Sequence, residues 1–245
     1  MDLGIKGKVA VITGGSIGIG RAVAEAFGAE GTHSVLCARG EGRVAEAARE
    51  ISRRYGVRSV PVAADVTRPQ DVARIVETAE RELGGADFLV NNAGAGSEET
   101  IMAADDSRWQ HYWELHVMAA VRMARGLVPS MRKRGGGAII NNASICARQP
   151  LGYEPVYNVT KAALVMFSKC LANELVGDNI RVNAINPGLV LTPDWVKTAT
   201  SLGAKEGISA DQYLDRIARQ NAPIARFGVR SRGLHTVTFS HPPST

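Results

Sequence analysis

Short apolar runs alternate along the chain with longer stretches of helical periodicity, and this alternation limits the possible folds more than any other feature. Six runs predict strands, at residues 9–13, 34–38, 59–64, 87–91, 138–144 and 181–186. Helical patterns lie between them, near residues 18–30, 41–55, 69–83, 105–133 and 156–177. The strand candidates are continuously apolar, which is typical of strands covered on both faces in a parallel sheet. The order predicts an α/β fold with helices on both sides of one parallel sheet.

The chain of 245 residues shows no linker and no internal repeat, so we expect a single domain spanning residues 1–245. Its predicted architecture is a Rossmann-type doubly wound sheet of six to seven strands, with the ligand crevice at the carboxyl ends of the strands. The pattern loosens over residues 187–225, where three prolines and two short helical stretches occur. This segment is either a lid over the substrate or a structural loop, and its composition does not decide between the two.

The composition is that of a soluble globular protein, with 45% hydrophobic and 22% charged residues. No apolar run approaches the roughly 18–20 residues of a membrane span. The first residues lack the pattern of a signal peptide, so we expect a cytoplasmic protein without a membrane partner. The net charge of +5 is spread along the chain, whereas a nucleic-acid surface requires a dense basic stripe. The three cysteines and five histidines show no metal-ligand spacing, so no metal site is predicted.

The first strand runs directly into the glycine-rich segment TGGSIGIG, residues 13–20, which in turn opens a helix. Glycines allow a sharp turn and a close approach of a phosphate to the unpaired N–H groups at the start of that helix. A strand, a glycine loop and a helix in this order indicate dinucleotide binding, and a plain tight turn is the alternative. The residues predicted to bind the cofactor here are Gly14, Ser16, Ile17, Gly18, Ile19 and Gly20.

The loop spacing, T-G-x-x-x-G-x-G, resembles that of the short-chain dehydrogenase/reductase family. Further motifs similar to that family follow in the expected order: Asp65 with Val66, NNAG at 91–94, YNVTK at 157–161, and Pro187 with Gly188. The resemblance covers about residues 5–228. It implies an NAD(P)-dependent oxidoreductase that interconverts a ketone or 3-oxo group and a secondary alcohol. It also implies that the cofactor contacts Asp65, Val66, Asn92, Ala93, Gly94, Pro187, Gly188, Val190 and Thr192.

The choice between the two nicotinamide cofactors is expected to depend on the end of the second strand. An acidic residue there binds the ribose 2′-hydroxyl of NAD, whereas an arginine accommodates the 2′-phosphate of NADP. Ala38 occupies the position that is acidic in NAD-preferring relatives, and Arg39 follows it. The planar, permanently charged guanidinium of Arg39 suits a phosphate. We therefore predict NADP(H), with NAD(H) as the alternative if Arg39 is only a surface residue that opens a helix.

Tyr157 and Lys161 are four residues apart, which places both side chains on one face of a helix. A neighbouring ammonium group lowers the pKa of a phenol, so Lys161 is predicted to lower the pKa of Tyr157. Ser144 lies 13 residues before Tyr157, the separation seen in the family. The resemblance implies that Tyr157 is the general acid and base, that Ser144 binds the substrate oxygen, and that Lys161 also holds the nicotinamide ribose. A catalytically weakened binding protein with the same fold is the alternative.

His116 departs from the family pattern, because relatives carry a catalytic asparagine seven residues after a tryptophan, here Trp109. The resemblance implies that this position anchors a water that passes protons to the lysine. Histidine would add a titratable group to such a relay. We expect His116→Asn to retain activity and to flatten any pH dependence near neutrality, and His116→Leu to be impaired. The alternative is a core histidine without a catalytic role.

The substrate of the predicted enzyme is a small carbonyl or alcohol compound whose identity the sequence leaves open. Ile145, Gln149, Tyr153 and the lid residue Trp195 are expected to line the pocket. Ketones, 3-oxoacyl thioesters, cyclic alcohols and steroids all fit an apolar pocket of this kind. Residues 229–245 lack the acidic helix and small-residue strand of relatives, and we hypothesise a frameshifted or truncated end. Relatives use that region for oligomer contacts, and a homodimer or homotetramer is expected.

Overall fold

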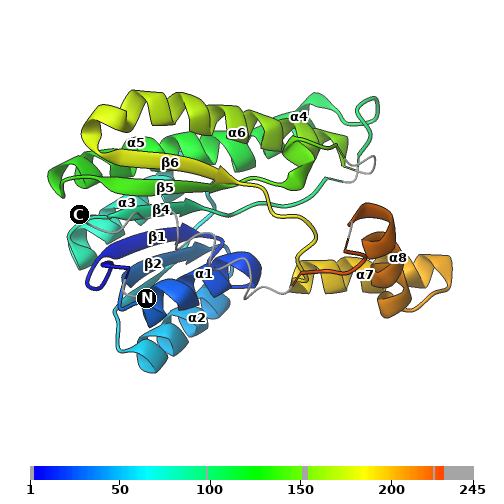
Figure 1. Ribbon diagram of the computed structural model, residues 1–245, viewed down its shortest axis with the longest axis horizontal. Coiled ribbons are helices and arrows are strands. Elements are labelled where there is room, and N and C mark those ends of the chain that lie inside the picture. Colours follow the sequence, from blue (N-terminus) through cyan, green and yellow to red (C-terminus); the bar gives the residue numbers. More distant parts are fainter. Residues whose placement is uncertain (1–2, 98, 151–153, 223, 229–245) are drawn as a thin grey trace.

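The computed structural model describes residues 3–97, 99–150, 154–222 and 224–228. Its centre is a six-stranded parallel sheet in the order β3-β2-β1-β4-β5-β6 (Figure 1). The strands are β1 (Val9–Thr13), β2 (His33–Ala38), β3 (Ser59–Ala63), β4 (Phe88–Asn91), β5 (Gly137–Asn142) and β6 (Ile180–Ile185). The predicted doubly wound α/β sheet is confirmed. A seventh strand in residues 229–245 would lie outside the described residues.

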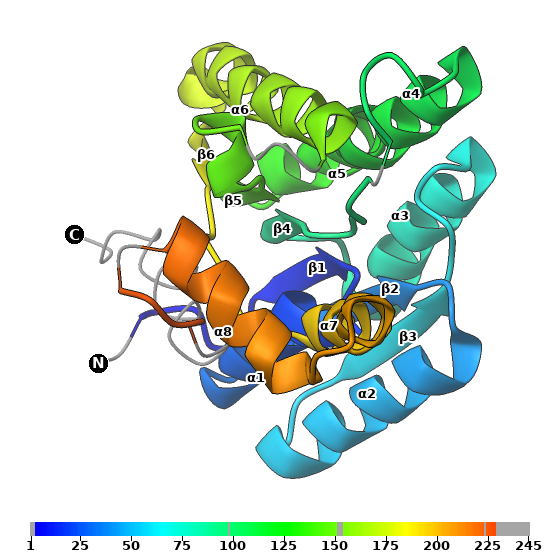
Figure 2. The ribbon, with the colours of Figure 1, turned by 90° about the vertical axis from the view of Figure 1, so that its right-hand side faces the viewer.

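Helices cover both faces of the sheet, as Figure 2 shows in a view toward the carboxyl ends of the strands. One face carries α1 (Gly18–Ala29) and α2 (Glu41–Tyr55). The other face carries α3 (Pro69–Leu83), α5 (Ala119–Lys133) and α6 (Pro155–Leu175). The order of the strands reverses between β1 and β4, and the carboxyl ends at such a reversal are where open α/β sheets bind their ligands.

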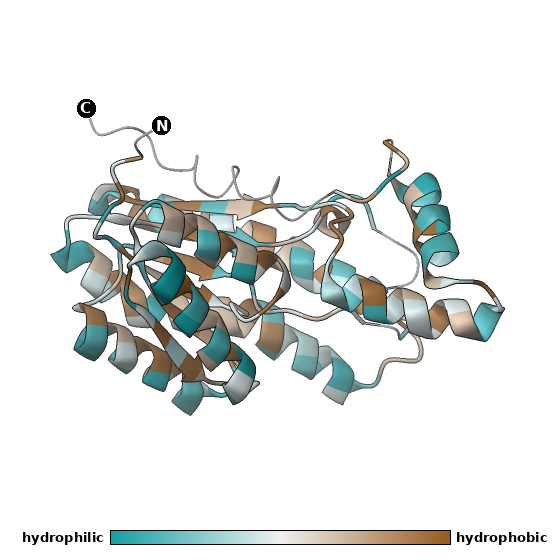
Figure 3. Ribbon diagram, turned by 90° about the horizontal axis from the view of Figure 1, so that it is seen from below, coloured by the Kyte–Doolittle hydropathy of each residue, from teal (hydrophilic) through white to brown (hydrophobic). Residues whose placement is uncertain are grey.

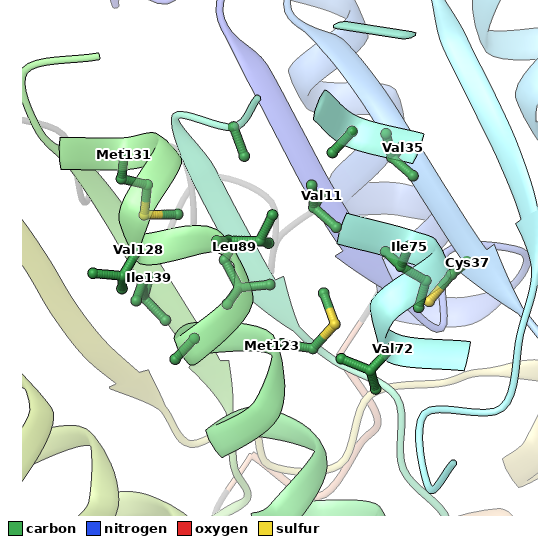
Figure 4. Close-up of a cluster of buried hydrophobic side chains, with 14 of the residues drawn as sticks. Val11, Val35, Cys37, Val72, Ile75, Leu89, Met123, Val128, Met131 and Ile139 are labelled. Carbon is green, nitrogen blue, oxygen red and sulfur yellow. The ribbon is translucent and has the colours of Figure 1, made fainter. Parts of the chain in front are cut away.

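The two largest hydrophobic cores of the described residues follow from the alternation of side chains along each strand. Val11 and Leu89 point into the core beneath α3 and α5, whereas their neighbours Ile12 and Val90 point into the core beneath α1 and α2. Figure 4 shows the first of these cores, with Met123 and Ile75 reaching toward the sheet from the two helices. Each fully buried aliphatic side chain contributes about 1.5–3 kcal/mol. Hydropathy is accordingly highest in the strands and lower on the outer helical surfaces (Figure 3).

The long helix predicted over residues 105–133 is interrupted in the structure. Asp105 caps its first part, α4 (Asp106–Trp113), by accepting a hydrogen bond from the backbone N–H of Arg108 at 2.9 Å. A π-helical segment, Glu114–Met118, then precedes α5. Such wide turns are rare and occur often at functional sites. His116 lies within this segment.

The loosened segment predicted over residues 187–225 forms two helices, α7 (Pro193–Glu206) and α8 (Ala210–Asn221), which lie beyond the ends of the strand arrows in Figure 1. These helices pack on each other around a small apolar cluster of their own, in which the rings of Trp195 and Phe227 meet edge to face at 5.2 Å. Among the residues that the structure describes, short 3-10 segments occur at Ile145–Ala147 and Val176–Asp178. Among the described residues, no helix is long and apolar enough to cross a membrane.

Candidate active site

The glycine loop after β1 is packed too closely to hold larger side chains. A Cβ atom on Gly20 would lie 2.3 Å from the carbonyl oxygen of Gly14 and 2.4 Å from Nδ2 of Asn92. Gly14 also has a φ of +66°, in the left-handed region that favours glycine. Helix α1 begins here without a side-chain cap from Ile17 and without an acidic residue in its first turn. Its free N–H groups and positive dipole end therefore fit the diphosphate of a dinucleotide.

The loop after β4 is tied to this glycine loop by hydrogen bonds around Thr13. The hydroxyl of Thr13 accepts from the backbone N–H groups of Asn92 at 2.8 Å and Ala93 at 3.0 Å. The side-chain amide of Asn92 in turn donates to the carbonyl oxygens of Thr13 at 3.0 Å and Gly14 at 3.3 Å. The structure thus brings the predicted cofactor residues Asn92, Ala93 and Gly14 together at the ends of neighbouring strands.

Arg39 and Asp65 follow the neighbouring strands β2 and β3, where the adenine half of a dinucleotide is expected. Partial burial raises the pKa of Asp65, but hydrogen bonds from Thr67 and the charges of Arg39 and Arg68 outweigh burial, and the pKa falls below its ordinary value. Arg39 is exposed. A positive group in reach of solvent beside this corner fits a phosphate better than a neutral hydroxyl. Val66, next in the chain, is buried in the core.

Ser144, Tyr157 and Lys161 lie together, as predicted from their spacing. Ser144 follows β5, and its hydroxyl accepts a hydrogen bond from the backbone N–H of Cys146 at 3.2 Å and hydrogen-bonds Tyr157. Lys161 is buried on α6, and its Nζ donates to the carbonyl oxygen of Asn142 at 2.8 Å. The same Nζ lies 5.3 Å from the centroid of the Tyr157 ring. A hydroxyl donor, a phenol and an ammonium group therefore converge on one place.

The predicted lowering of the pKa of Tyr157 by Lys161 is not seen in this structure. Burial raises the pKa of Tyr157 well above its ordinary value of 10, Glu154 adds to the rise, and the hydrogen bond from Ser144 opposes it only in part. The ammonium of Lys161 lies over the ring, and burial lowers its own pKa to about 8. Desolvation therefore dominates both groups, and Tyr157 holds its proton at neutral pH.

His116 lies beside Tyr157, in the place that the register predicts. Its ring meets that of Tyr157 edge to face at 5.3 Å between centroids. The backbone N–H of Ala95 donates to Nε2 at 3.3 Å, so Nε2 is the acceptor and Nδ1 carries the proton. Nδ1 then donates to the hydroxyl of Thr160 at 2.8 Å, which donates to the carbonyl oxygen of Tyr157 at 3.0 Å.

The expectation that His116 titrates near neutrality is wrong. Burial, with the charge of Lys161, holds the pKa of His116 well below its ordinary value of 6.5. The ring is 2% exposed, and both of its nitrogens already have partners. His116 is thus a neutral residue that joins the π-helical segment to the loop after β4 and to α6, and replacing it by asparagine is no longer expected to flatten a pH profile.

Glu154 is a residue of this site that the sequence did not single out. It accepts a hydrogen bond from Sγ of Cys146 at 3.6 Å, and its other oxygen lies against Gly96. Burial raises its pKa from 4.5 to about 7. Glu154 precedes Tyr157 by one helical turn, as Tyr157 precedes Lys161. The sequence signal for Glu154 is therefore its spacing from Tyr157, although the spacing does not report how far the Glu154 side chain is removed from water.

The residues after β6 close the site from the side of α7. The carbonyl oxygen of Pro187 accepts a hydrogen bond from the backbone N–H of Ile145 at 2.9 Å. Gly188 follows, and Val190 forms an isolated bridge with Gly228. Thr192 caps α7, and its side chain lies near Gly18, 3.7 Å from where a Cβ on that glycine would be. Ile145 and Gln149 are exposed at the rim, and Ser16, Ile17 and Ile19 are half-buried. Tyr153 lies outside the described residues.

Comparisons with known proteins agree with this geometry. Residues 8–208 match the family model described as short chain dehydrogenase. The chain is 32% identical to the uncharacterized oxidoreductase YvrD of Bacillus subtilis, over 98% of this chain and 91% of that protein. It is 33% identical to the 3-oxoacyl-[acyl-carrier-protein] reductase FabG of Escherichia coli, over 78% of this chain and 76% of that protein.

Among solved structures, L-sorbose reductase from Gluconobacter frateurii, in complex with NADPH and L-sorbose, superposes with a TM-score of 0.96. The two sequences are 60% identical, and the superposition covers 98% of this chain and 92% of that chain. The same ancestry is indicated by the family model, by the glycine loop and by the side chains of Ser144, Tyr157 and Lys161. The chain belongs to the short-chain dehydrogenase family and is an oxidoreductase.

Proposed function

We propose that this protein uses NADP(H) to interconvert the ketone of a polyhydroxylated compound, a ketose, and the corresponding secondary alcohol. The observation that carries the proposal is the half-buried carboxyl group of Glu154 beside the convergent Ser144, Tyr157 and Lys161. Its partner in this structure is the weak thiol donor of Cys146, and a purely apolar ketone would offer it no further hydrogen bond. A substrate hydroxyl would donate a hydrogen bond to it.

Two observations support NADP(H) as the cofactor. Arg39 follows β2, next to Ala38 in the position that is acidic in NAD-preferring relatives, and its charge acts on Asp65 at the same corner. The solved relative at 60% identity is complexed with NADPH. The glycine loop has no room for a Cβ atom at Gly14 or Gly20. Such a loop lets the backbone approach a diphosphate closely, which fits a dinucleotide. When bound, the nicotinamide would supply or accept the hydride.

The chain's own residues would manage the proton and the developing charge on the substrate oxygen. Ser144 would donate a hydrogen bond to that oxygen, which stabilises the negative charge that grows on it during reduction. Tyr157 would donate its proton to the same oxygen, and its raised pKa keeps that proton in place until then. Lys161 would hold the ribose with its remaining N–H donors, because one of the three already binds Asn142.

The substrate class is supported by the name of the solved relative and by Glu154. L-sorbose, a ketose, is the compound bound in that relative. A 3-oxoacyl thioester, the substrate class named for the Escherichia coli relative, is the second candidate. It offers no hydroxyl near the ketone for Glu154, so the half-buried carboxyl group favours the ketose.

The test is a screen that follows the loss of NADPH absorbance with three substrate classes: L-sorbose and other ketoses, a 3-oxoacyl thioester, and an apolar cyclic ketone. We expect turnover with a ketose. We also expect Glu154→Gln to raise KM for the ketose far more than KM for the cyclic ketone. Turnover of the thioester alone would overturn the ketose assignment, and inactivity toward all three classes would overturn the proposed reaction.

The predicted homodimer or homotetramer in the cytoplasm belongs to the same proposal. Exposed apolar side chains on α6, Val159 and Met166, are available for contact with a second copy. Light scattering of the purified protein would give the mass of the assembly. A monomer at micromolar concentration would contradict this part of the proposal.

A further inference from the structure

Asn142, the last residue of β5, contacts both halves of the active site. Its side-chain Nδ2 donates to Oδ1 of Asn92, on the neighbouring strand end, at 2.8 Å. Its backbone carbonyl accepts the hydrogen bond from Nζ of Lys161, also at 2.8 Å. The residue is 8% exposed. One residue therefore connects the lysine of the reacting centre to the loop that follows β4.

The bond from Asn142 determines which way the amide of Asn92 points. Because Oδ1 of Asn92 accepts from Asn142, its Nδ2 is turned toward the carbonyl oxygens of Thr13 and Gly14. The same Nδ2 lies 2.4 Å from where a Cβ on Gly20 would be. The glycine loop is therefore packed directly against an amide whose orientation Asn142 sets.

The other atom of the Asn142 amide argues against a purely stabilising role. Oδ1 is buried without a hydrogen-bond partner among the described residues, and an unsatisfied buried acceptor destabilises a fold. Its neighbour Asn141 points to the opposite face of the sheet and is fully bonded. Oδ1 of Asn141 accepts from Asn91 at 2.8 Å, and its Nδ2 donates to Ser168 at 2.8 Å. The two adjacent asparagines thus form a natural comparison.

We propose that Asn142 is a positioning residue for the dinucleotide. Its amide holds Asn92 in the orientation that binds the carbonyl groups of the glycine loop, and those bonds keep the loop's N–H groups directed at the diphosphate. Without the donor, the Asn92 amide is free to rotate, and a bound conformation that is less populated binds its ligand more weakly. The inference rests on the cofactor part of the proposed function and is independent of the substrate.

The experiment measures the NADPH dissociation constant of the full chain by nucleotide fluorescence, together with the midpoint of thermal unfolding. Asn142→Leu is nearly isosteric and removes both the donor and the unsatisfied acceptor. We expect its dissociation constant to rise roughly threefold to tenfold, the effect of one buried hydrogen bond, with an unfolding midpoint equal to or above that of the wild type. Asn142→Asp keeps the size but replaces the donor by an acceptor, and should weaken NADPH binding at least as much.

Asn141→Leu is the matched control, because it removes two satisfied bonds on the other face of the same strand. It should lower the unfolding midpoint and leave the dissociation constant of the folded protein near the wild-type value. An unchanged dissociation constant in both Asn142 variants would overturn the proposal. So would a weakening of NADPH binding in Asn141→Leu equal to that in Asn142→Leu. A wild type that binds NADH and not NADPH would instead refute the cofactor assignment, and the same variants would then be read with NADH.

Discussion

Replacing Glu154 by glutamine should make the stability of this protein less dependent on pH. Burial raises the pKa of Glu154 from 4.5 to about 7 in the folded protein, so the folded state prefers the protonated carboxyl. The corresponding stability is present below the unfolded pKa and is lost as the pH rises through about 7. Glutamine resembles the protonated form at every pH and does not undergo this loss.

The magnitude follows from proton linkage with these two pKa values. Between roughly pH 5.5 and roughly pH 8.5, the wild type should lose about 2 kcal/mol of unfolding free energy relative to the variant. For a chain of this size, each kcal/mol shifts the unfolding midpoint by about 2–4 °C, so the gap between the proteins should widen by roughly 4–8 °C. The other titrating groups, Lys161 among them, are present in both proteins. Their contributions cancel when the unfolding free energy of the variant is compared with that of the wild type at each pH.

The assay is thermal and urea unfolding of both proteins across that pH range. Glu174→Gln, an exposed glutamate on the same helix, serves as the control and should follow the wild type. A second readout comes from the oxidation direction. Glu154 raises the pKa of Tyr157, so its removal should shift the alkaline limb of the rate profile to lower pH. Parallel stability curves for wild type and Glu154→Gln would refute the reasoning, because they would mean that Glu154 is ionised as readily as a surface carboxyl.

Three further predictions concern the predicted site residues. Tyr157→Phe should reduce turnover by about 10²–10⁴-fold while NADPH binding, measured directly, stays within a few-fold of the wild type; substantial residual activity would refute its role as acid and base. Arg39→Asp should reverse the preference from NADPH to NADH in steady-state kinetics, and a retained NADPH preference would show that Arg39 is only a surface residue. His116→Asn should retain activity with an unchanged pH profile, whereas His116→Leu, which cannot bond Ala95 or Thr160, should lose it; full activity of the leucine variant would return His116 to the core.

Periodicity was sufficient to locate the sheet, because the four central strands are buried on both faces and read as continuous apolar runs. The edge strands β3 and β6 expose Pro61 and Asn183 but are still rich in apolar residues. Strand β1 has the predicted bounds, Val9–Thr13, and the other strands differ by a residue or two at their ends. The π-helical segment Glu114–Met118 could not be predicted in the same way. A wide turn preserves the apolar pattern of a helix, and it differs from an α-helical turn in its backbone hydrogen bonds, which the spacing of apolar residues does not report.

The sequence predicted which residues form the site better than it predicted their pKa values, and the reason is physical. Spacing places Tyr157 and Lys161 on one helical face, but the pKa of each depends on how much water it has lost. Burial raises the pKa of Tyr157 and lowers that of Lys161. The same effect gives Glu154 and His116 their unusual pKa values. Sequence motifs report which groups meet, whereas desolvation depends on packing from several elements.

The apolar cluster of α7 and α8 is separate from the cores that pack against the sheet. This separation explains how one fold can keep its chemistry while its substrate changes. The side chains proposed to act on the substrate oxygen, from Ser144 to Lys161, lie after β5 and on α6, and apolar residues of both elements pack in a main core. Helices α7 and α8 pack around Trp195 in a separate cluster. They join the rest of the chain near Val190, whose bridge with Gly228 closes the base of the pair. A substitution inside that cluster should therefore alter KM for the substrate before it alters the position of Tyr157, because cores that do not touch contribute nearly independently.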